Sequence, residues 1–384
     1  MELSPSQTSP VVLQVLPRLV TGGVERGTID VALALKAAGW VPLVASHGGP
    51  MVRELERAGV EHLTLPLHSK NPMVITRNIG RLQALIRERG VDIVHARSRA
   101  PAWSAFAAAR RAGARFVTTF HGTYNLGPLP FKKSYNAIMT RGERVIAISR
   151  FIASHLTENY EIDPDRIRII PRGIDLTRYD PGAVSANRVI SLAKAWRLAD
   201  GMPVVMLPGR LTRWKGQEVL IEALSRLGRH DLRCLLVGAD QGRVKYRGEL
   251  ERMVRRLDMG DVIHIVDHCP DMAAAYMLSD VVVSASTDPE AFGRVSVEAQ
   301  AMGRPVIASD HGGSRETVIH GLTGWLVPPN DPDSLARAID DVLTLGPRER
   351  TALAERQIRH VHAQFSKETM CERTLGVYEE ILRP

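Results

Sequence analysis

Short apolar runs alternate with longer amphipathic segments throughout the first half of the chain. Residues 11–16 (VVLQVL) have the length and composition of a buried strand, and residues 28–39 carry apolar side chains at helical spacing before a terminal glycine. The same pairing of a short run with a longer segment recurs until residues 166–175 (RIRIIPRGID). Strands that alternate with helices predict a parallel sheet covered by helices on both faces.

A second series of the same kind follows a polar, turn-rich segment. The series runs from 203–210 (PVVMLPGR) to 332–346 (PDSLARAIDDVLTLG), and the segment 180–189 (DPGAVSANRV) separates it from the first. We therefore predict two doubly wound α/β domains, at 1–185 and 186–365, and a terminal helix at 366–384. Two such domains that face each other bind ligands in the cleft between them, at the carboxyl ends of the strands.

The composition is typical of a folded enzyme. Of the 384 residues, 44% are hydrophobic and 24% are charged, which argues against a fibrous or disordered chain. The three cysteines lie far apart and match neither a disulfide framework nor a metal-binding spacing, as is usual in a reducing cytoplasm. The N-terminus lacks the basic and apolar parts of a signal peptide, and no apolar run reaches the ~18–20 residues of a membrane span. We expect a cytoplasmic protein.

The positive charge is unevenly distributed along the chain. Residues 1–185 contain 24 Lys and Arg against 15 Asp and Glu, whereas residues 186–384 contain 26 against 27. The net charge of +8 therefore comes from the first half. This half is expected to meet an anionic partner, for which nucleic acid, a phosphorylated acceptor and a membrane surface are all candidates at this point.

Several familiar binding motifs are excluded. The glycines at 22, 23 and 27 do not fit the dinucleotide pattern G-x-G-x-x-G, and no acidic residue follows about 20 positions later. Two Asp-Pro-Asp triplets, at 163–165 and 331–333, are interpreted as turn and helix-cap chemistry. His264, His268 and Cys269 are interpreted as residues of a strand and its end rather than metal ligands. We expect no bound metal and no nicotinamide or flavin cofactor.

Two basic residues of the second domain lie on a predicted strand-to-helix loop. Arg210 and Lys215 belong to the stretch LPGRLTRWKG, directly after a strand. A guanidinium that binds phosphate through two hydrogen bonds and a mobile ammonium would together neutralise a diphosphate without a metal. The alternative is that both are solvated surface cations.

A second loop-to-helix segment of this domain carries two carboxylates. In DPEAFGRVSVEAQAMG, Glu290 lies in the loop and Glu298 lies eight residues later in the helix. Residues 292–295 would present backbone N–H groups at the helix N-terminus, a favourable place for an anion. Glu298 is suited to accept hydrogen bonds from a ribose and Glu290 from hydroxyls of another ring. Alternatively, Glu298 is a carboxylate at the edge of the core, paired with a nearby cation.

The first domain offers glycines and one histidine at strand ends. Gly22 and Gly23 follow the first strand and permit close approach of a ligand to the backbone. His121, in TTFHGTY, follows another strand, at the expected cleft. A histidine in this position is either catalytic or structural.

These segments resemble the retaining glycosyltransferases of family four. The resemblance covers almost the whole chain, and the matching segments occur in family order: GGVER, TTFHGTY, AISRFI, IPRGID, GRLTRWKG, EAFGRVSVEA, GRPVIASDHGGSRE and GLTGWLVPPND. It implies the glycosyltransferase B (GT-B) fold of two facing Rossmann-like domains with a cleft between them, and a final helix that packs back on the first domain. It also implies transfer of a sugar, without a metal or another cofactor, from a nucleotide diphosphate sugar such as a UDP-sugar or GDP-sugar.

The same resemblance implies roles for individual residues. Arg210 and Lys215 would bind the diphosphate, Glu298 the ribose, and Glu290 the sugar hydroxyls. His121 would contact the donor sugar at the reacting centre. The donor-binding positions would be completed largely by backbone, at Gly22, Gly23, Cys269, Phe292, Gly293, Arg294 and Val295.

Two positions depart from the family pattern. Arg172 stands where many relatives carry Asn, and Arg294 stands where a small or apolar residue is frequent. Arg294 either recognises an anionic donor such as a uronic acid or points into solvent, and we favour solvent.

The first domain is expected to hold the acceptor. Arg97, Arg99 and Tyr124 are the candidate acceptor-binding residues, and Lys70 and 132–133 add positive charge in loops or at a helix start. The amphipathic segment 131–141 is either an interfacial helix on anionic lipid or a plain surface helix. We favour an anionic glycan or glycolipid acceptor, such as a lipopolysaccharide core, at the inner face of the membrane.

Three other functions remain as alternatives. A glycosyltransferase with a soluble acceptor would need no membrane contact. A nucleotide-sugar 2-epimerase shares the two-domain architecture but would convert the nucleotide sugar without an acceptor. A nucleic-acid binder is disfavoured, because aromatic residues make up only 5% of the chain and no known reading module is present.

Overall fold

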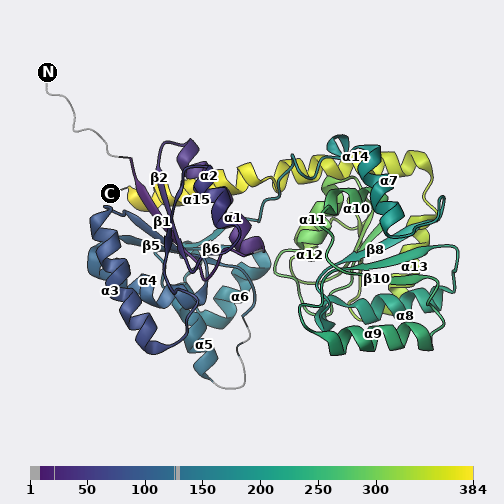
Figure 1. Cartoon of the computed structure of the whole chain (residues 1–384), viewed down its shortest axis with the longest axis horizontal. Helices are drawn as coiled ribbons and strands as arrows, with labels where there is room; N and C mark the ends of the chain where they lie inside the picture. The colour runs from purple at the N-terminus through teal and green to yellow at the C-terminus, as the bar shows by residue number, and fades with distance from the viewer. Residues whose placement is uncertain (1–8, 21, 125, 127–129, 384) are drawn as a thin grey trace. The chain divides into compact units, whose positions relative to one another are not determined.

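The computed structural model describes residues 9–20, 22–124, 126 and 130–383. The chain forms two compact units, of which the first comprises residues up to Gly173 together with those from Lys367 onward, and the second comprises Ile174–Ser366. Each unit is built around one parallel sheet (Figure 1). Within the described residues, no helix combines the length and apolar composition that a membrane span requires.

The first unit contains a seven-stranded sheet in the order β3-β2-β1-β4-β5-β6-β7. The strand bounds are β1 Val11–Val15, β2 Val41–Ser46, β3 Glu61–Thr64, β4 Ile93–Ala96, β5 Arg115–Phe120, β6 Arg144–Ala147 and β7 Ile167–Ile169. The order reverses between β1 and β4, where Val12 pairs with Ile93. Loops that follow these two strands therefore diverge, which is the usual position of a ligand site in such a sheet.

Helices cover this sheet as the periodicity predicts. Their bounds are α1 Gly23–Ala37, α2 Val52–Arg57, α3 Pro72–Glu88, α4 Arg99–Ala112, α5 Pro130–Asn136, α6 Arg150–Tyr160 and α15 Lys367–Leu382. The helix α15 packs on α1 (Figure 1). It is held to the sheet by Tyr378, whose hydroxyl lies 2.5 Å from Nδ1 of His95, and by Glu380, which pairs with Arg144 and Arg168.

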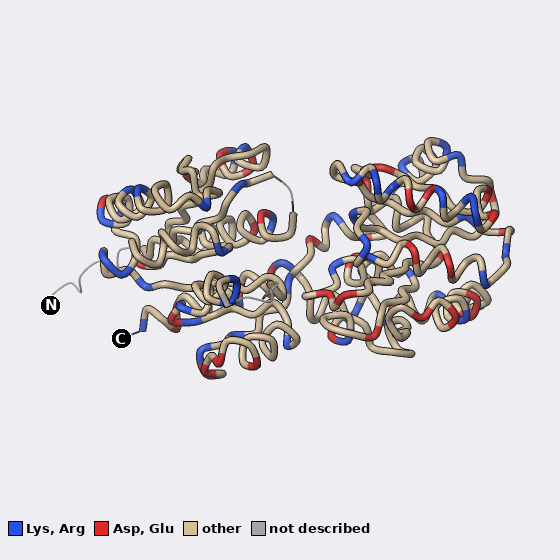
Figure 2. The backbone as a smooth tube through the Cα atoms, turned by 90° about the horizontal axis from the view of Figure 1, so that it is seen from below, with Lys and Arg blue, Asp and Glu red and all other residues tan. Residues whose placement is uncertain are grey.

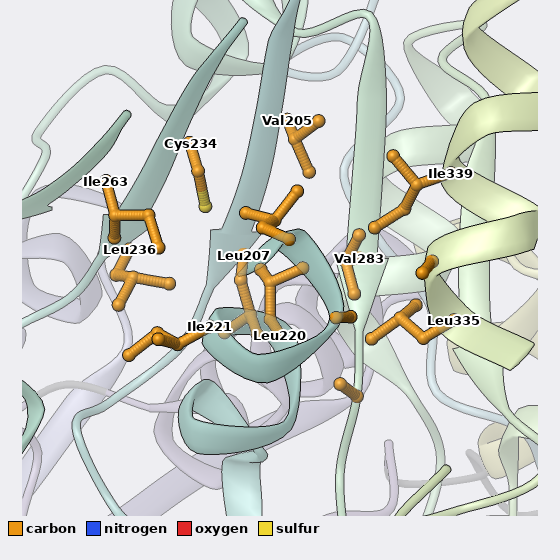
Figure 3. Close-up of a cluster of buried hydrophobic side chains, with 14 of the residues drawn as sticks. Val205, Leu207, Leu220, Ile221, Cys234, Leu236, Ile263, Val283, Leu335 and Ile339 are labelled. Carbon is orange, nitrogen blue, oxygen red and sulfur yellow. The ribbon is translucent and has the colours of Figure 1, made fainter. Parts of the chain in front are cut away.

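The second unit contains a six-stranded sheet in the order β10-β9-β8-β11-β12-β13. The strands are β8 Val204–Pro208, β9 Arg233–Val237, β10 Ile263–Val266, β11 Val281–Ser284, β12 Val306–Ser309 and β13 Trp325–Val327. The helices are α7 Ala186–Ala195, α8 Gln217–Leu227, α9 Val244–Arg256, α10 Met272–Leu278, α11 Arg294–Ala301, α12 Ser314–Thr317, α13 Pro332–Leu343 and α14 Pro347–Gln364. Figure 3 shows Leu220 and Ile221 of α8, with Leu335 and Ile339 of α13, packed on the apolar side chains of the strands.

The boundary between the units lies about a dozen residues before the one predicted from the polar segment 180–189. This segment forms a 3-10 turn at Pro181–Ala183 and the start of α7, and both belong to the second unit. The reason is an ion pair between Arg188 and Asp271, with Nη2 and Oδ1 2.7 Å apart, which ties α7 to the start of α10. The segment is therefore a polar surface element of the second unit, and the units divide at Gly173–Ile174.

The amphipathic segment 131–141 is not one continuous helix. It consists of α5 and a 3-10 turn at Ala137–Thr140, and Ile138 and Met139 of the turn are buried. The ring of Tyr135 stacks on Trp103, with centroids 6.0 Å apart, which leaves Phe131, 77% exposed, as the outward apolar side chain among those named. This arrangement favours the plain surface helix over the interfacial one.

Candidate donor and acceptor sites

The loop between β8 and α8 places Lys215 against Glu290. It ends at Gly216, whose φ of 71° is left-handed and where a Cβ atom would collide with the carbonyl oxygen of Ala285, so glycine is required. Nζ of Lys215 pairs with Oε1 of Glu290 and lies 4.2 Å from the centroid of the Trp214 ring. The side chains of Lys215 and Glu290 are only 15% and 12% exposed, so both are held in a single arrangement.

Glu290 is fixed by groups from three loops. Besides Lys215, Oγ of Ser286 donates to Oε1 at 2.6 Å, and the Gly313 N–H donates to the Glu290 carbonyl at 2.7 Å. These residues follow β8, β11 and β12, three adjacent strands of one sheet. Lys215 and Glu290, which the sequence assigns to different parts of the donor, thus lie together at the carboxyl edge of the sheet.

Arg210 lies on the same loop but is exposed. Its carbonyl accepts a hydrogen bond from Nε2 of Gln217 at 3.0 Å, which fixes the backbone. Among the residues that the structure describes, none accepts a hydrogen bond or forms an ion pair with its guanidinium. All its donors are therefore open to an anionic ligand at this sheet edge.

Glu298 is buried and already has two partners. Oε2 accepts a hydrogen bond from the Tyr276 hydroxyl at 2.9 Å, and Oε1 accepts one from Nε of Arg294 at 2.6 Å. The expectation that Arg294 points only into solvent is wrong, because it lies one helical turn before Glu298 and turns back to it. The Glu298 carboxylate in turn raises the pKa of Arg294. The ion pair is the alternative arrangement considered for Glu298, a carboxylate at the edge of the core.

The N-terminus of α11 is built by close backbone packing. Gly293 precedes the helix with φ 91°, and a Cβ atom there would lie 3.0 Å from Oγ1 of Thr317. The buried Phe292 ring packs edge-to-face on Phe365, with centroids 5.6 Å apart. The first backbone N–H groups of a helix, here from Arg294 and Val295, have no partner within it and favour an anion.

Cys269 follows β10 and is buried. Burial raises the pKa of its thiol, so the thiol stays protonated and unreactive at neutral pH. Any contact of this position with a ligand then falls to the main chain. No group of three His, Cys, Asp or Glu side chains with metal-binding geometry occurs in the described part of the chain.

In the first unit, Gly23 and His121 are linked by Arg172. Nη1 of Arg172 donates to the Gly23 carbonyl, and Nη2 lies 2.8 Å from Nδ1 of His121. A Cβ atom on Gly23 would lie 2.8 Å from Nη1 of Arg172, and one on Gly22, where φ is 142°, would lie 2.6 Å from the Glu25 carboxylate. Gly22 is favoured by its left-handed φ, and the start of α1 lies within reach of the Glu25 carboxylate and the Arg172 guanidinium. The role of Arg172 could not be seen in the sequence.

Arg97 and Arg99 lie two residues apart but contact different parts of the unit. Arg97 is only 4% exposed, and a Cβ atom on Gly27 of α1 would lie 3.0 Å from its Nη2. Nη1 of Arg99 donates to Asn136 at 2.7 Å, and its guanidinium carbon lies 4.0 Å from the centroid of the Tyr124 ring. Arg99 and Tyr124 are therefore brought together, whereas Arg97 is buried beside α1.

A pocket of about 460 Å³ in the first unit gathers basic side chains from a loop and from two helices. Lys70, Arg99 and Lys132 line it, together with Pro17, His68, Ser98, Ala100, Tyr135 and Asn136. The basic residues follow β3, β4 and β5, so their sequence positions alone do not indicate a shared pocket. His68, Ser98, Tyr135 and Asn136 had no sequence signal.

Comparisons with known proteins agree with this architecture. Residues 21–178 match the family model "Glycosyltransferase Family 4", and residues 191–360 match "Glycosyl transferases group 1". A D-inositol 3-phosphate glycosyltransferase of Geodermatophilus obscurus is 32% identical over 250 residues, which are 63% of this chain and 53% of that protein. The match thus spans about half the length of this curated relative.

Two solved structures share the fold over nearly their whole length. Anabaena HepE, solved with UDP and glucose, is 23% identical, covers 96% of this chain and 99% of its own, and has a TM-score of 0.83. A glycosyltransferase from Rickettsia africae is 40% identical over 98% of this chain and 99% of its own, with a TM-score of 0.91. Together with the two family models, this match shows that the chain belongs to glycosyltransferase family 4, with the GT-B fold of two Rossmann-like domains.

Proposed function

We propose that the protein transfers a sugar from a nucleoside diphosphate sugar to an acceptor that bears a phosphate or carboxylate. The observation that carries the proposal is the group of Arg210, Lys215 and Glu290 at one edge of the second sheet. It combines an exposed guanidinium, a partly buried ammonium and a fixed carboxylate.

The donor would be held through its charges and its hydroxyls. Arg210 and Lys215 supply positive charge for the diphosphate, and the N-terminus of α11 supplies backbone N–H groups, so no metal is required. Lys215 has three donors and can bind a phosphate oxygen while it keeps one hydrogen bond to Glu290. Glu290 then presents its second oxygen to sugar hydroxyls, and Glu298 is placed to accept from the ribose.

The reaction would depend on electrostatic stabilisation rather than on a protein nucleophile. Cleavage of the bond between sugar and phosphate leaves an oxocarbenium-like sugar and a nucleoside diphosphate trianion, and Lys215 and Arg210 stabilise the departing charge. The leaving phosphate oxygen takes the proton of the acceptor hydroxyl on the same face of the sugar. The anomeric configuration would then be retained.

The acceptor would be recognised by the pocket of Lys70, Arg99 and Lys132. Three cations from three separate elements around one cavity suit a phosphate or carboxylate, and Tyr135 adds an aromatic wall. The D-inositol 3-phosphate glycosyltransferases are named for a phosphorylated polyol, which supports an anionic acceptor. The same chemistry fits a soluble sugar phosphate and a phosphorylated glycolipid such as a lipopolysaccharide core.

The donor proposal is tested by thermal unfolding with UDP-, GDP-, ADP- and CMP-sugars. A ligand at 100 times its dissociation constant stabilises the fold by about 2.7 kcal/mol, so one base class should raise Tm. Lys215→Ala should abolish this rise and the transfer, whereas Lys245→Ala, at an exposed lysine of the same unit, should preserve both. An unchanged Tm with every nucleotide sugar, or conversion of the nucleotide sugar without an acceptor, would overturn it.

The acceptor proposal is tested with Lys70→Ala and Lys132→Ala. Each should raise KM for a phosphorylated acceptor about tenfold, through loss of a charge-assisted hydrogen bond, and leave donor binding unchanged. Lys133→Ala is the matched control, since Lys133 is exposed but does not line the pocket. Assays with inositol phosphate and with a detergent-dispersed phosphorylated glycolipid separate the two acceptor sources, and flotation with anionic vesicles tests the membrane contact. If the three variants have the same KM for the phosphorylated acceptor, the pocket does not bind it.

A further inference from the structure

Arg172 connects Gly23 and His121, the two groups of the first unit that the sequence resemblance places at the donor sugar. It follows β7, and its guanidinium donates one hydrogen bond to the Gly23 carbonyl at the start of α1 and a second to Nδ1 of His121. The Nη2–Nδ1 distance is 2.8 Å. The imidazole is thereby fixed to two other elements of the fold, although it stands on a loop after β5.

The direction of this hydrogen bond determines where the imidazole carries its proton. A guanidinium has N–H donors only and remains charged at any pH that proteins tolerate. Nδ1 of His121 must therefore be the acceptor, and the proton of the neutral ring lies on Nε2. An imidazolium would place an N–H on Nδ1 and direct it at the guanidinium, so protonation breaks the contact.

The surroundings favour the neutral ring as well. Burial lowers the pKa of His121 well below 6.5, and Arg172, Arg97 and His95 add to this effect. His95 is itself kept neutral by burial, and it lies between Thr119 and Tyr378. The carboxylate next to Arg172 is Glu25 of α1, which lies near the guanidinium rather than the imidazole.

The opposite edge of the ring carries a donor without a protein acceptor. Nε2 of His121 is buried and has no hydrogen-bond partner among the described residues. A buried N–H without a partner costs about 1–3 kcal/mol, which a ligand oxygen would recover. Nδ1 of His121 is therefore bound by Arg172, whereas the N–H on Nε2 is available to donate a hydrogen bond to a ligand.

We propose that Arg172 is a positioning residue that fixes His121 as the Nε2–H tautomer, so that His121 donates a hydrogen bond to an oxygen of the donor sugar and does not act as a base. The tautomer part rests on the structure alone, and the sugar contact rests on the proposed function.

The tautomer is tested by nitrogen-15 NMR of the full-length protein with labelled histidine. His121→Gln assigns the signal, whose two ring-nitrogen shifts distinguish the tautomers and the imidazolium. The wild type should show a neutral Nε2–H ring between pH 5 and 8. Arg172→Met should show mixed tautomers and a ring that becomes protonated at higher pH than in the wild type, while Arg172→Lys, with one donor group, should lie between them. Arg115→Met, at an exposed arginine of the same unit, should leave the signal unchanged.

Kinetics then test the sugar contact. Arg172→Met should lower kcat about tenfold or more with a smaller change in donor KM, and should move the acid limb of kcat to higher pH. An Nδ1–H ring or an imidazolium in the wild type at pH 7 would overturn the tautomer assignment. A correct tautomer with kcat unchanged in Arg172→Met would overturn the sugar contact. If no nucleotide sugar supports transfer by the wild type, the proposed function fails instead, and the NMR result still decides the role of Arg172.

Discussion

At the scale of single residues, the Arg294–Glu298 pair orients a buried carboxylate that would meet the ribose of the proposed donor. Oε1 of Glu298 is held by Arg294 and Oε2 by Tyr276, so each oxygen already has one donor and keeps further lone pairs for ligand hydroxyls. The hydrogen bonds keep a buried carboxylate oriented in the absence of ligand. Arg294 is 41% exposed, so its outer N–H groups remain accessible.

Arg294→Ala should therefore weaken both the fold and donor binding. The variant leaves the buried Glu298 with one protein donor, and we expect the free energy of unfolding to fall by about 1 kcal/mol. Because the carboxylate loses its orientation, the Kd for the nucleotide should rise by up to about tenfold. Thermal unfolding and nucleotide titration measure the two effects, with Arg243→Ala as an exposed control in the same unit. Tighter nucleotide binding would show that Arg294 competes with the ribose.

The sequence revealed the candidate donor residues but not their partners. Arg210, Lys215, Glu290 and Glu298 stand in loop and helix segments with a recognisable local pattern. The contacts of Ser286 with Glu290 and of Tyr276 with Glu298 join separate elements, and no local pattern encodes them. The basic pocket was missed for the same reason, because Lys70, Arg99 and Lys132 follow three different strands.

At the scale of elements, α8 is bounded by two left-handed glycines that differ in their surroundings. Gly216 before the helix and Gly228 after it have φ of 71° and 66°. A Cβ atom on Gly216 would collide with the Ala285 carbonyl, whereas one on Gly228 would have no atom within 4 Å. The two sites thus share a left-handed backbone conformation, and they differ in the room available for a Cβ atom.

Gly216→Ala and Gly228→Ala should separate these two effects. Gly228→Ala should lower the free energy of unfolding by about 1 kcal/mol, the cost of a left-handed alanine. Gly216→Ala should lower the free energy of unfolding by about 1–3 kcal/mol more than Gly228→Ala, because the loops after β8 and β11 must move apart. It should also weaken nucleotide binding, since Lys215 is the preceding residue. Equal losses in denaturant titrations would show that Ala285 does not constrain the loop.

The helix α15 depends on one buried hydrogen bond to the sheet of the first unit. Tyr378→Phe removes the hydroxyl that contacts His95 and leaves the ring packing in place. We expect the free energy of unfolding to fall by about 1–2 kcal/mol, because Nδ1 of His95 loses its partner. Chemical denaturation checks this value, and Glu372→Gln, at an exposed position of the same helix, is the control. No difference between the two variants would contradict it.

The elements themselves were predicted well, because parallel sheets impose a simple alternation of short apolar runs and amphipathic segments. The prediction failed where tertiary contacts decide the outcome. The segment 131–141 has helical periodicity, yet part of its second half is a 3-10 turn in which Ile138 and Met139 are buried. The segment 180–189 is polar like a linker, yet Arg188 binds it to Asp271.

At the scale of the whole molecule, the charge difference between the halves comes from residues spread along the chain. Figure 2 shows Lys and Arg positions at many places along the backbone of the first unit. The cations that line the pocket are a local concentration within this wider excess. The excess itself would attract an anionic acceptor, and the pocket would select it.

Buried neutral histidines should make the protein sensitive to mild acid. Burial lowers the pKa of His95 and His121 well below 6.5 in the folded state. Below pH 6.5 the unfolded chain binds protons that the native state does not, so stability is lost as the pH falls. Each histidine should lower the free energy of unfolding by about 1.4 kcal/mol per pH unit. Denaturant titrations between pH 6.5 and 5 should show this slope, and His121→Gln should reduce it. A flat profile would contradict the prediction.

The path of the chain has a consequence for biosynthesis. Residues 174–366 form the second unit without interruption, and at its boundaries the Ile174 N–H donates to the Phe365 carbonyl at 2.8 Å. The first unit is split, because α15 comes from residues after Ser366. On the ribosome the unit that begins first would therefore be completed last, after the inserted unit has folded. A nascent chain arrested at residue 366 and released should contain a protease-resistant second unit and a protease-sensitive first unit. In that chain His95 lacks its hydrogen-bond partner Tyr378.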